Sequence, residues 1–358
     1  MAKAQSELQW KQELASTNRD KVVEAFRAEI DKLTANVLTP IPAEHPEFQD
    51  AKKLATPGRF ILNRKRSGAW KCRGVVRGDL QDRERLDGAD FVYYAAASQA
   101  MAVRSLIFRG RRRRNWKRGT VDVRAAYTQS MKFDKDEPAR YVYFKNPLDH
   151  QRMYFRQSTT LYGEASAARR WAETLTGHLR TIGFIPGAND PTVWHNPKTH
   201  VSLVIHTDDI YFDGPADGIE IFLTRLGNLI ELQEPAYLTN STPIDFIGIM
   251  IAVDDDNTYM SMQPYIRAAL EVLQQDFPTL PASSTPFEGS IDETSTELPY
   301  AQQKIYRSAV GAIGWMTSVR IDLDFAFSRL SQHLKRPIIS HRPISTSVRT
   351  FNVEDWSL

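Results

Sequence analysis

The chain has 358 residues, of which 42% are hydrophobic, a formal net charge of +3 and a single cysteine, Cys72. This size and composition predict two or three subdomains with real cores, and they exclude long disorder, a disulfide miniprotein and a cysteine-rich zinc domain. Neither a run of about 18 apolar residues nor a secretory signal pattern occurs, so we expect no membrane partner and a cytoplasmic location, with the nucleus as the alternative.

Periodicity and breaker residues predict a mixed α+β chain. Residues 5–35 have helical spacing of apolar positions, and three prolines between 40 and 46 end that helix. Strands are expected at 59–63, 70–77, 119–127, 141–144 and 152–155, and helices at 95–108 and 164–182. Two hairpins follow, at 201–214 and 244–263, with a helix at 219–226 between them. Helices at 264–275 and 305–335 precede a polar tail.

The charges are unevenly distributed along the chain. Basic residues concentrate at 59–77 and 104–118, and the second stretch contains no acidic residue. Acidic residues gather at 208–209, 254–256 and 322–324. This pattern indicates that the basic residues bind a polyanion next to carboxylates that bind metal. The alternative is a solvated surface, with a nuclear-import signal in the arginine run.

The segment HTDD at 206–209 is the strongest local signal for chemistry. Asp208 and Asp209 are adjacent carboxylates between apolar strands, where their repulsion costs about 4 kcal/mol at about 4 Å and an effective dielectric near 20. Asp122 lies in another apolar stretch, and if the two strands are neighbours these carboxylates form an oxygen-rich site suited to Mg²⁺. The alternative is an ordinary surface turn, in which Asp-Asp pairs are frequent.

Six segments occur in a fixed order along the chain. They are KCRGVVRG at 71–78, DVRAAYTQS at 122–130, LYGEASAARRW at 161–171, HTDD, FIGI followed by QPYI, and YRSAVGAIGW leading to RIDL. They resemble KARLVARG, DVKTAFLNG, LYGLKQAPRAW, YVDD, FLGI with Q-x-x-Y-I, and YR-x-x-IGSL with RPDI in the reverse transcriptases of copia-type retrotransposons. The resemblance covers about residues 20 to 341.

This resemblance implies an α+β right-handed polymerase fold with fingers, palm and thumb, in which an antiparallel palm sheet packs on helices. It implies an N-terminal helical segment at 1–45, fingers and palm at 46–255, a thumb- or connection-like helical region at 256–341 and a loose tail at 342–358. The implied activity is an RNA-directed DNA polymerase that transfers a nucleotide to the primer 3′-OH with Mg²⁺ or Mn²⁺. Its partners would be an RNA template, a DNA primer and duplex, dNTPs and other retroelement proteins.

The resemblance also assigns roles to individual residues. Asp122, Asp208 and Asp209 would be the catalytic, metal-binding carboxylates, with Asp209 in the supporting position. Tyr127 would be the steric gate against a ribose 2′-OH, with a core aromatic as the alternative. Contacts with the incoming nucleotide are expected from Lys71, Arg73, Arg77, Tyr162 and Gly163, for which ordinary surface roles are the alternative. Contacts with nucleic acid are expected from Phe246, Ile247, Gly248, Arg111 and Arg112, although FIGI also fits a core strand.

Several positions depart from the family pattern. His206 and Thr207 replace the Tyr and Val before the paired aspartates, and RIDL lacks the proline of RPDI. Glu164, Ala165 and Ser166 replace Leu-Lys-Gln, which predicts that the nucleotide pocket loses a cation and gains an anion. These departures give the alternative function, a catalytically inactive nucleic-acid-binding remnant of such an element.

Overall fold

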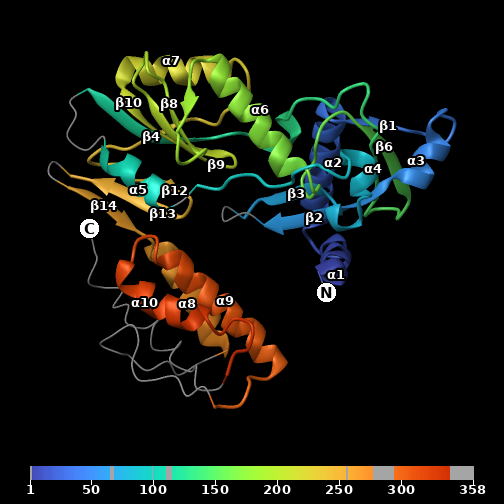
Figure 1. Ribbon diagram of the computed structural model, residues 1–358. Coiled ribbons are helices and arrows are strands. Elements are labelled where there is room, and N and C mark those ends of the chain that lie inside the picture. Colours follow the sequence, from blue (N-terminus) through green and yellow to red (C-terminus); the bar gives the residue numbers. More distant parts are fainter. Residues whose placement is uncertain are drawn as a thin grey trace. The chain divides into compact units, whose positions relative to one another are not determined.

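A computed structural model describes residues 2–64, 68–98, 100–109, 115–254, 257–276 and 294–338, which fall into two compact units (Figure 1). Unit 1 comprises Met1–Ala97, Asp122–Lys198 and Glu220–Gln233. Unit 2 comprises Ser98–Val121, Thr199–Ile219 and Glu234–Leu358. Each unit is therefore assembled from three separate stretches of the chain.

Unit 1 combines helices with a mixed sheet. Its helices are α1 (Ala2–Leu14), α2 (Arg19–Asn36), α3 (Phe48–Leu54), α4 (Arg83–Asp87) and α6 (Ala167–Thr181). Its strands are β1 (Leu38–Pro40), β2 (Thr56–Arg64), β3 (Trp70–Val76), β5 (Tyr141–Lys145), β6 (Arg152–Gln157), β7 (Ile185–Pro186) and β8 (Val193–His195). Five strands form one sheet in the order β1-β6-β5-β2-β3, in which only β2 and β5 run parallel.

The two N-terminal helices share their core with this sheet. Trp10 of α1 donates its indole N–H to the carbonyl of Phe60 on β2 at 2.8 Å. Phe26 of α2 meets the Phe60 ring edge-on at 5.0 Å, and Phe60 stacks on Phe144 of β5 at 4.7 Å. Aromatic pairs of this kind stabilise a core beyond their burial. Residues on both sides of the expected boundary at 45 and 46 therefore belong to one core, and the domain boundaries themselves stay predictions.

The single helix expected over 5–35 is wrong, because the chain turns at residues 15–18. Ser16 accepts a hydrogen bond from the Asn18 backbone N–H at 3.0 Å, and the Asn18 amide donates to Glu13 at 3.0 Å. Short polar side chains that bond locally in this way compete with the helix.

Unit 2 contains the second sheet and the C-terminal helices. Its helices are α5 (Ala100–Arg109), α8 (Gln263–Asp276), α9 (Tyr300–Met316) and α10 (Asp324–Ser331), and α7 (Ala216–Gly227) begins in it. Its strands are β4 (Trp116–Asp122), β9 (Ser202–His206), β10 (Asp209–Pro215), β11 (Ala236–Tyr237), β12 (Ile244–Phe246), β13 (Ile249–Val253) and β14 (Thr258–Ser261). The order β11-β4-β10-β9 gives a sheet against which α5 packs, and β12-β13-β14 form a separate meander.

The helix expected over 305–335 is also divided, because α9 ends at Met316. Arg104 of α5 donates to the carbonyls of Thr317 and Ser318 at 2.7 and 2.6 Å. A guanidinium satisfies the carbonyls that a helix leaves unpaired at its C-terminus. Arg104 thereby ties α5 to the end of α9 within unit 2.

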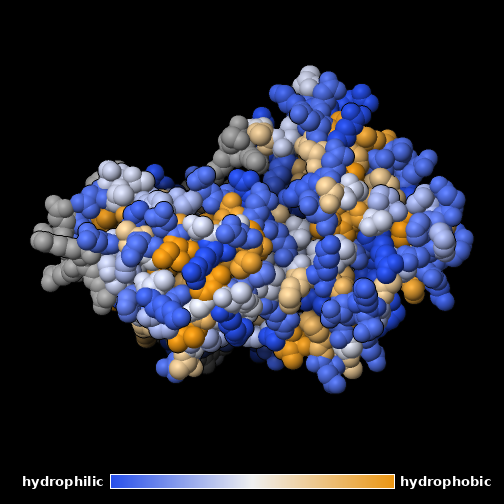
Figure 2. Space-filling view, turned by 90° about the horizontal axis from the view of Figure 1, so that it is seen from above, coloured by the Kyte–Doolittle hydropathy of each residue, from blue (hydrophilic) through white to orange (hydrophobic). Residues whose placement is uncertain are grey.

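The face of the molecule seen in Figure 2 is predominantly polar. Hydrophilic residues cover most of the face in Figure 2, and apolar residues form separate patches on it. In the part of the chain that the structure describes, no helix has the length and apolarity that a membrane span requires.

Candidate active site

The paired aspartates lie at the turn of the β9–β10 hairpin. Asp209 pairs with His206, so Thr207 and Asp208 form a two-residue turn. Thr207 has φ +59° and is the one central residue of this turn with a positive φ, as in a type II′ turn. A β-branched residue in this region of backbone space is strained, and such strain concentrates at functional sites. The strands on either side are buried, so the hairpin holds both aspartates at a fixed place in the sheet.

His206, which precedes the turn, is anchored from a second segment. Its Nδ1 shares a hydrogen bond with the Ser98 hydroxyl at 2.9 Å. Burial lowers the pKa of His206, although the charge of Asp208 acts in the opposite direction. The side chain that replaces the tyrosine of the family is therefore held in the hairpin by a specific contact.

Asp122 is the last residue of β4, and β4 is a hydrogen-bonded neighbour of β10. The expected adjacency of these two strands is confirmed. Beyond β4, the Asp122 carbonyl accepts the Gln233 N–H at 2.8 Å, and Val123 bridges to Leu232. The meeting of the three carboxylates at one metal site stays a prediction. Among the described residues, no group of three or more His, Cys, Asp or Glu side chains is arranged so that it could hold a metal ion.

Tyr127 lies in a tight turn just after Asp122. Ala125 adopts a left-handed conformation, with φ +50°, and a 3₁₀ turn follows at Ala126–Gln129. The Tyr127 carbonyl accepts a hydrogen bond from the Thr160 hydroxyl at 2.8 Å. Its half-buried ring meets the Tyr162 ring edge-on, with 5.1 Å between centroids. The chain thus brings Tyr127 and Tyr162 together, as two of the residues expected to contact the nucleotide.

Arg73 completes this group within unit 1. Its guanidinium carbon lies 4.5 Å from the centroid of the Tyr162 ring, which is a cation–π arrangement. Arg73 and Lys71 alternate on β3 with buried Cys72, so both face away from the sheet's core. Arg77 follows the strand and forms an exposed ion pair with Asp79 at 2.6 Å. Arg73 thus contacts the tyrosine pair formed by Tyr127 and Tyr162.

The turn that carries Tyr162 and Gly163 extends the edge of β3. The Val76 N–H donates to the Tyr162 carbonyl at 2.7 Å, and the Gly78 N–H donates to the Gly163 carbonyl at 3.0 Å. Gly163 has φ +87°, and a Cβ there would lie 2.2 Å from the Val76 carbonyl oxygen. This close approach requires glycine. The LYG segment is therefore fixed to the strand that bears Arg73.

The expectation that Glu164 adds an anion to the nucleotide pocket is wrong. Glu164 is 6% exposed, and its Oε1 accepts hydrogen bonds from the Leu161 N–H at 3.0 Å and from the Gln157 side-chain amide. Burial raises the pKa of Glu164, although these donors and the nearby Arg140 act against it. The carboxyl group points into the interior because the Leu161–Glu164 turn offers it a buried backbone donor.

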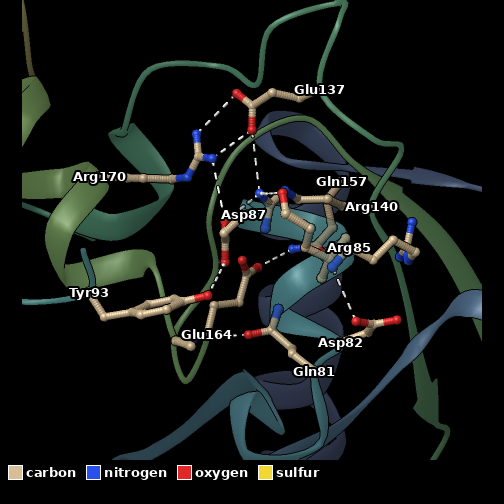
Figure 3. Close-up of polar contacts among 12 residues, drawn as sticks. Gln81, Asp82, Arg85, Asp87, Tyr93, Glu137, Arg140, Gln157, Glu164 and Arg170 are labelled. Carbon is tan, nitrogen blue, oxygen red and sulfur yellow. Dashed lines mark hydrogen bonds and ion pairs between the residues drawn. The ribbon is translucent and has the colours of Figure 1, made fainter. Parts of the chain in front are cut away.

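A buried ion network lies in the same unit, and sequence reasoning did not find it. Figure 3 shows Arg140 and Arg170 directed at Asp87 and Glu137. Arg140 lies 2.6 Å from Asp87, and Arg170 lies 2.6 Å from Glu137; the side chains of Arg140 and Asp87 are 1% and 2% exposed. Tyr93 donates its hydroxyl to Asp87 at 3.1 Å. The sequence offered one signal for this network, namely the position of Arg140 directly before the apolar strand YVYF.

The residues expected to contact nucleic acid divide into three cases. Phe246 is 1% exposed and its ring packs 5.8 Å from Tyr211, so its side chain belongs to the core of unit 2. Ile247 and Gly248, with φ +51° and +81°, form the two-residue turn between β12 and β13. Arg111 and Arg112 lie outside the described residues. Contact of any of them with nucleic acid stays a prediction.

Comparison with known proteins identifies relatives of this chain. No family model matches it. The Retrovirus-related Pol polyprotein from transposon RE2 of Arabidopsis thaliana is 25% identical over 240 residues, which cover 64% of this chain and 15% of that protein. The Transposon Ty1-DR5 Gag-Pol polyprotein of Saccharomyces cerevisiae is 21% identical over 340 residues, which cover 89% of this chain and 18% of that protein. The chain thus spans less than a fifth of the length of these relatives.

A solved structure supports the fold. The foamy viral protease-reverse transcriptase in complex with double-stranded DNA superimposes with a TM-score of 0.52 and 13% sequence identity, over 92% of this chain and 47% of that one. The homologues of the chain are therefore retrotransposon Pol polyproteins of the copia type, and its α+β fold is that of a reverse transcriptase. Both expectations from the sequence are confirmed.

Proposed function

We propose that this chain is the RNA-directed DNA polymerase region of a copia-type retroelement, a nucleotidyltransferase that extends a DNA primer on an RNA template. The observation that carries the proposal is the sheet in which β10 starts at Asp209 and lies beside β4, the strand that ends at Asp122. The relationship to Pol polyproteins and the reverse transcriptase fold support it.

We infer that Asp122, Asp208 and Asp209 hold Mg²⁺ or Mn²⁺. The donor set fits a hard divalent cation, because the hairpin offers carboxylate oxygens and Mg²⁺ needs one or two of these besides water and substrate phosphates. Such an ion, when bound, stabilises the charge on the attacking primer oxygen and on the leaving pyrophosphate. The chain's own contribution is to fix the carboxylates at the strained turn and at the end of β4, a half-buried strand.

The incoming dNTP is assigned to the Arg73–Tyr162–Tyr127 cluster. Tyr162 covers one face of the Arg73 guanidinium, and no carboxylate pairs with Arg73 among the described residues. A planar cation held in this way presents its N–H donors to phosphate oxygens. Lys71 and Arg77 add positive charge nearby on the chain. The Tyr127 ring would exclude a 2′-hydroxyl by steric clash.

Nucleic acid is the partner class that the comparisons support, because the foamy viral enzyme is described in complex with double-stranded DNA. We assign the Ile247–Gly248 turn to the primer end, with Phe246 as its buried anchor. Arg111 and Arg112 would contact phosphate. An RNA template, a DNA primer and other retroelement proteins complete the proposed partners.

The alternative is an inactive remnant that binds nucleic acid, and the specific observation in its favour is the polar His206 and Thr207 before the aspartates. A primer-extension assay on poly(rA)·oligo(dT), run beside filter binding of the same duplex, separates the two functions. Magnesium-dependent extension supports the polymerase. Binding without extension supports the remnant, and the absence of both contradicts both proposals.

A further inference from the structure

The Leu161–Glu164 turn is closed by two reciprocal hydrogen bonds. The Glu164 backbone N–H donates to the Leu161 carbonyl at 3.3 Å, and the Glu164 carboxyl accepts the Leu161 N–H at 3.0 Å. Leu161 is fully buried, so water does not replace that acceptor. The side chain of Glu164 therefore closes the inner side of a turn whose outer side is bonded to β3.

A second element holds the same carboxyl group. Gln157, the last residue of β6, is 6% exposed and donates its side-chain amide to the same Oε1 atom (Figure 3). Its backbone N–H donates to the Arg140 carbonyl at 2.9 Å. The next residue after the turn, Ala165, donates its N–H to the Gln81 side chain at 2.9 Å. Glu164 thus links the turn to the interior of the unit and not to solvent.

The neighbouring ion network does not use Glu164. Asp87 and Glu137 are matched by Arg140 and Arg170, so two carboxylates face two guanidinium groups. Among the described residues, Glu164 has no ion-pair partner within 4.0 Å. Glu164 therefore acts in the fold as a hydrogen-bond acceptor in a fixed position. A neutral side chain of the same shape, such as glutamine, would accept the same hydrogen bonds.

We propose that Glu164 is a positioning residue for nucleotide binding, which holds the Leu161–Glu164 turn so that the Tyr162 ring stays between Arg73 and Tyr127. This inference rests on the proposed polymerase function. The ring contacts at 4.5 and 5.1 Å connect Tyr162 to both residues. Without the buried acceptor, the Leu161 N–H and the Gln157 amide lose their partner, and the turn relaxes to find another. Arg73 then loses its contact with the Tyr162 ring, which orients the N–H donors of the guanidinium group.

The test compares Glu164→Ala, Glu164→Met and Glu164→Gln in the full chain, with Glu173→Gln as the matched control. Glu173 is a half-exposed carboxylate on α6 that pairs with Arg169. Extension kinetics give KM for dNTP and kcat, and hydrogen exchange of the Val76 and Gly78 amides reports the turn directly. Thermal unfolding shows whether each variant is folded. If Glu164→Ala does not fold, Glu164→Met removes the acceptor while it keeps apolar volume.

We expect loss of the acceptor to raise KM for dNTP about tenfold with kcat nearly unchanged, and to speed exchange of both amides by a similar factor. Glu164→Gln and Glu173→Gln should stay within about twofold of the wild type. Wild-type KM and exchange in a folded Glu164→Met variant would overturn the proposal, as would a Glu164→Gln variant that is as impaired as Glu164→Met. Failure of the polymerase function itself is seen separately, as a wild-type chain that does not extend the primer.

Discussion

Substitution of Arg73 by alanine perturbs the proposed nucleotide pocket most selectively. The side chain projects from the face of β3 opposite the core, and its guanidinium carbon lies 4.5 Å from the centroid of the Tyr162 ring. In the part of the chain that the structure describes, removal of the guanidinium therefore leaves no buried hydrogen-bond partner unsatisfied. The stability of the fold should change by no more than the cation–π contribution, about 0.5–2 kcal/mol.

The effect on nucleotide binding should be larger. Hydrogen bonds between a guanidinium and phosphate oxygens contribute about 1.5–3 kcal/mol, and about 1.36 kcal/mol corresponds to a factor of ten. Arg73→Ala should thus raise KM for dNTP about 10- to 150-fold. Arg73→Lys keeps the charge but loses the planar group that stacks on Tyr162, so its KM should lie between those of the wild type and Arg73→Ala.

Steady-state primer extension over a range of dNTP concentrations measures these effects. Arg152→Ala is the matched control, because Arg152 also lies over a tyrosine ring, at 4.7 Å from that of Tyr143, in the same unit. Its KM should match the wild type. A KM for Arg73→Ala within about twofold of the wild type would refute the assignment of Arg73 to the triphosphate.

Three further predictions concern buried and pocket residues. Arg140→Ala should lower the free energy of unfolding in urea by about 3–5 kcal/mol, because Asp87 stays buried without its main partner; a loss below about 1 kcal/mol would contradict this. Tyr127→Val should raise incorporation of ribonucleotides relative to deoxynucleotides, whereas Tyr127→Phe should keep the wild-type preference. If Tyr127→Val lost activity equally on both substrates, Tyr127 would be a core residue and not a steric gate. Burial raises the pKa of Glu164, so its contribution to stability is fully present below the ordinary value of 4.5 and is lost as pH rises through the folded value. The free energy of unfolding of Glu164→Gln should therefore rise relative to that of the wild type as pH increases from 4.5 towards neutrality. If the free energies of the two proteins changed in parallel with pH, Glu164 would not have a raised pKa.

Local elements with strong periodicity were predictable from the sequence. The apolar stretches around HTDD predicted the β9–β10 hairpin, and the turn falls at Thr207 and Asp208. The helix expected over 164–182 is present as α6, but it starts at Ala167 because Glu164 closes a turn before it. The cost of unpaired carboxylates on apolar strands led us to expect that the strands of Asp122 and Asp208 are neighbours, and the sheet confirms that β4 lies beside β10.

Burial of charged residues was not predictable, because it depends on partners far away in the sequence. Arg140 and Asp87 are 53 residues apart, and neither has a local pattern that marks it as internal. Glu164 was assigned to the pocket because the Leu-Lys-Gln segment that it helps to replace lies near the nucleotide pocket in the family. The Glu164 side chain instead points inward, where it accepts a hydrogen bond from the buried Leu161 N–H. The helices at the N-terminus likewise share a core with β2 through Trp10, a contact that periodicity within each helix does not encode.

Single-turnover extension of oligo(dT) on poly(rA) by carboxylate variants tests the proposed activity most directly. The variants are Asp122→Asn, Asp208→Asn and, as control, Asp217→Asn, which changes an exposed aspartate of α7. We predict that the first two abolish extension while they leave duplex binding intact, because metal-held charge stabilisation is worth several kcal/mol and about 1.36 kcal/mol is tenfold in rate. Asp217→Asn should extend at the wild-type rate. Retention of about a tenth or more of the wild-type rate by Asp122→Asn or Asp208→Asn would contradict the assignment of the active site.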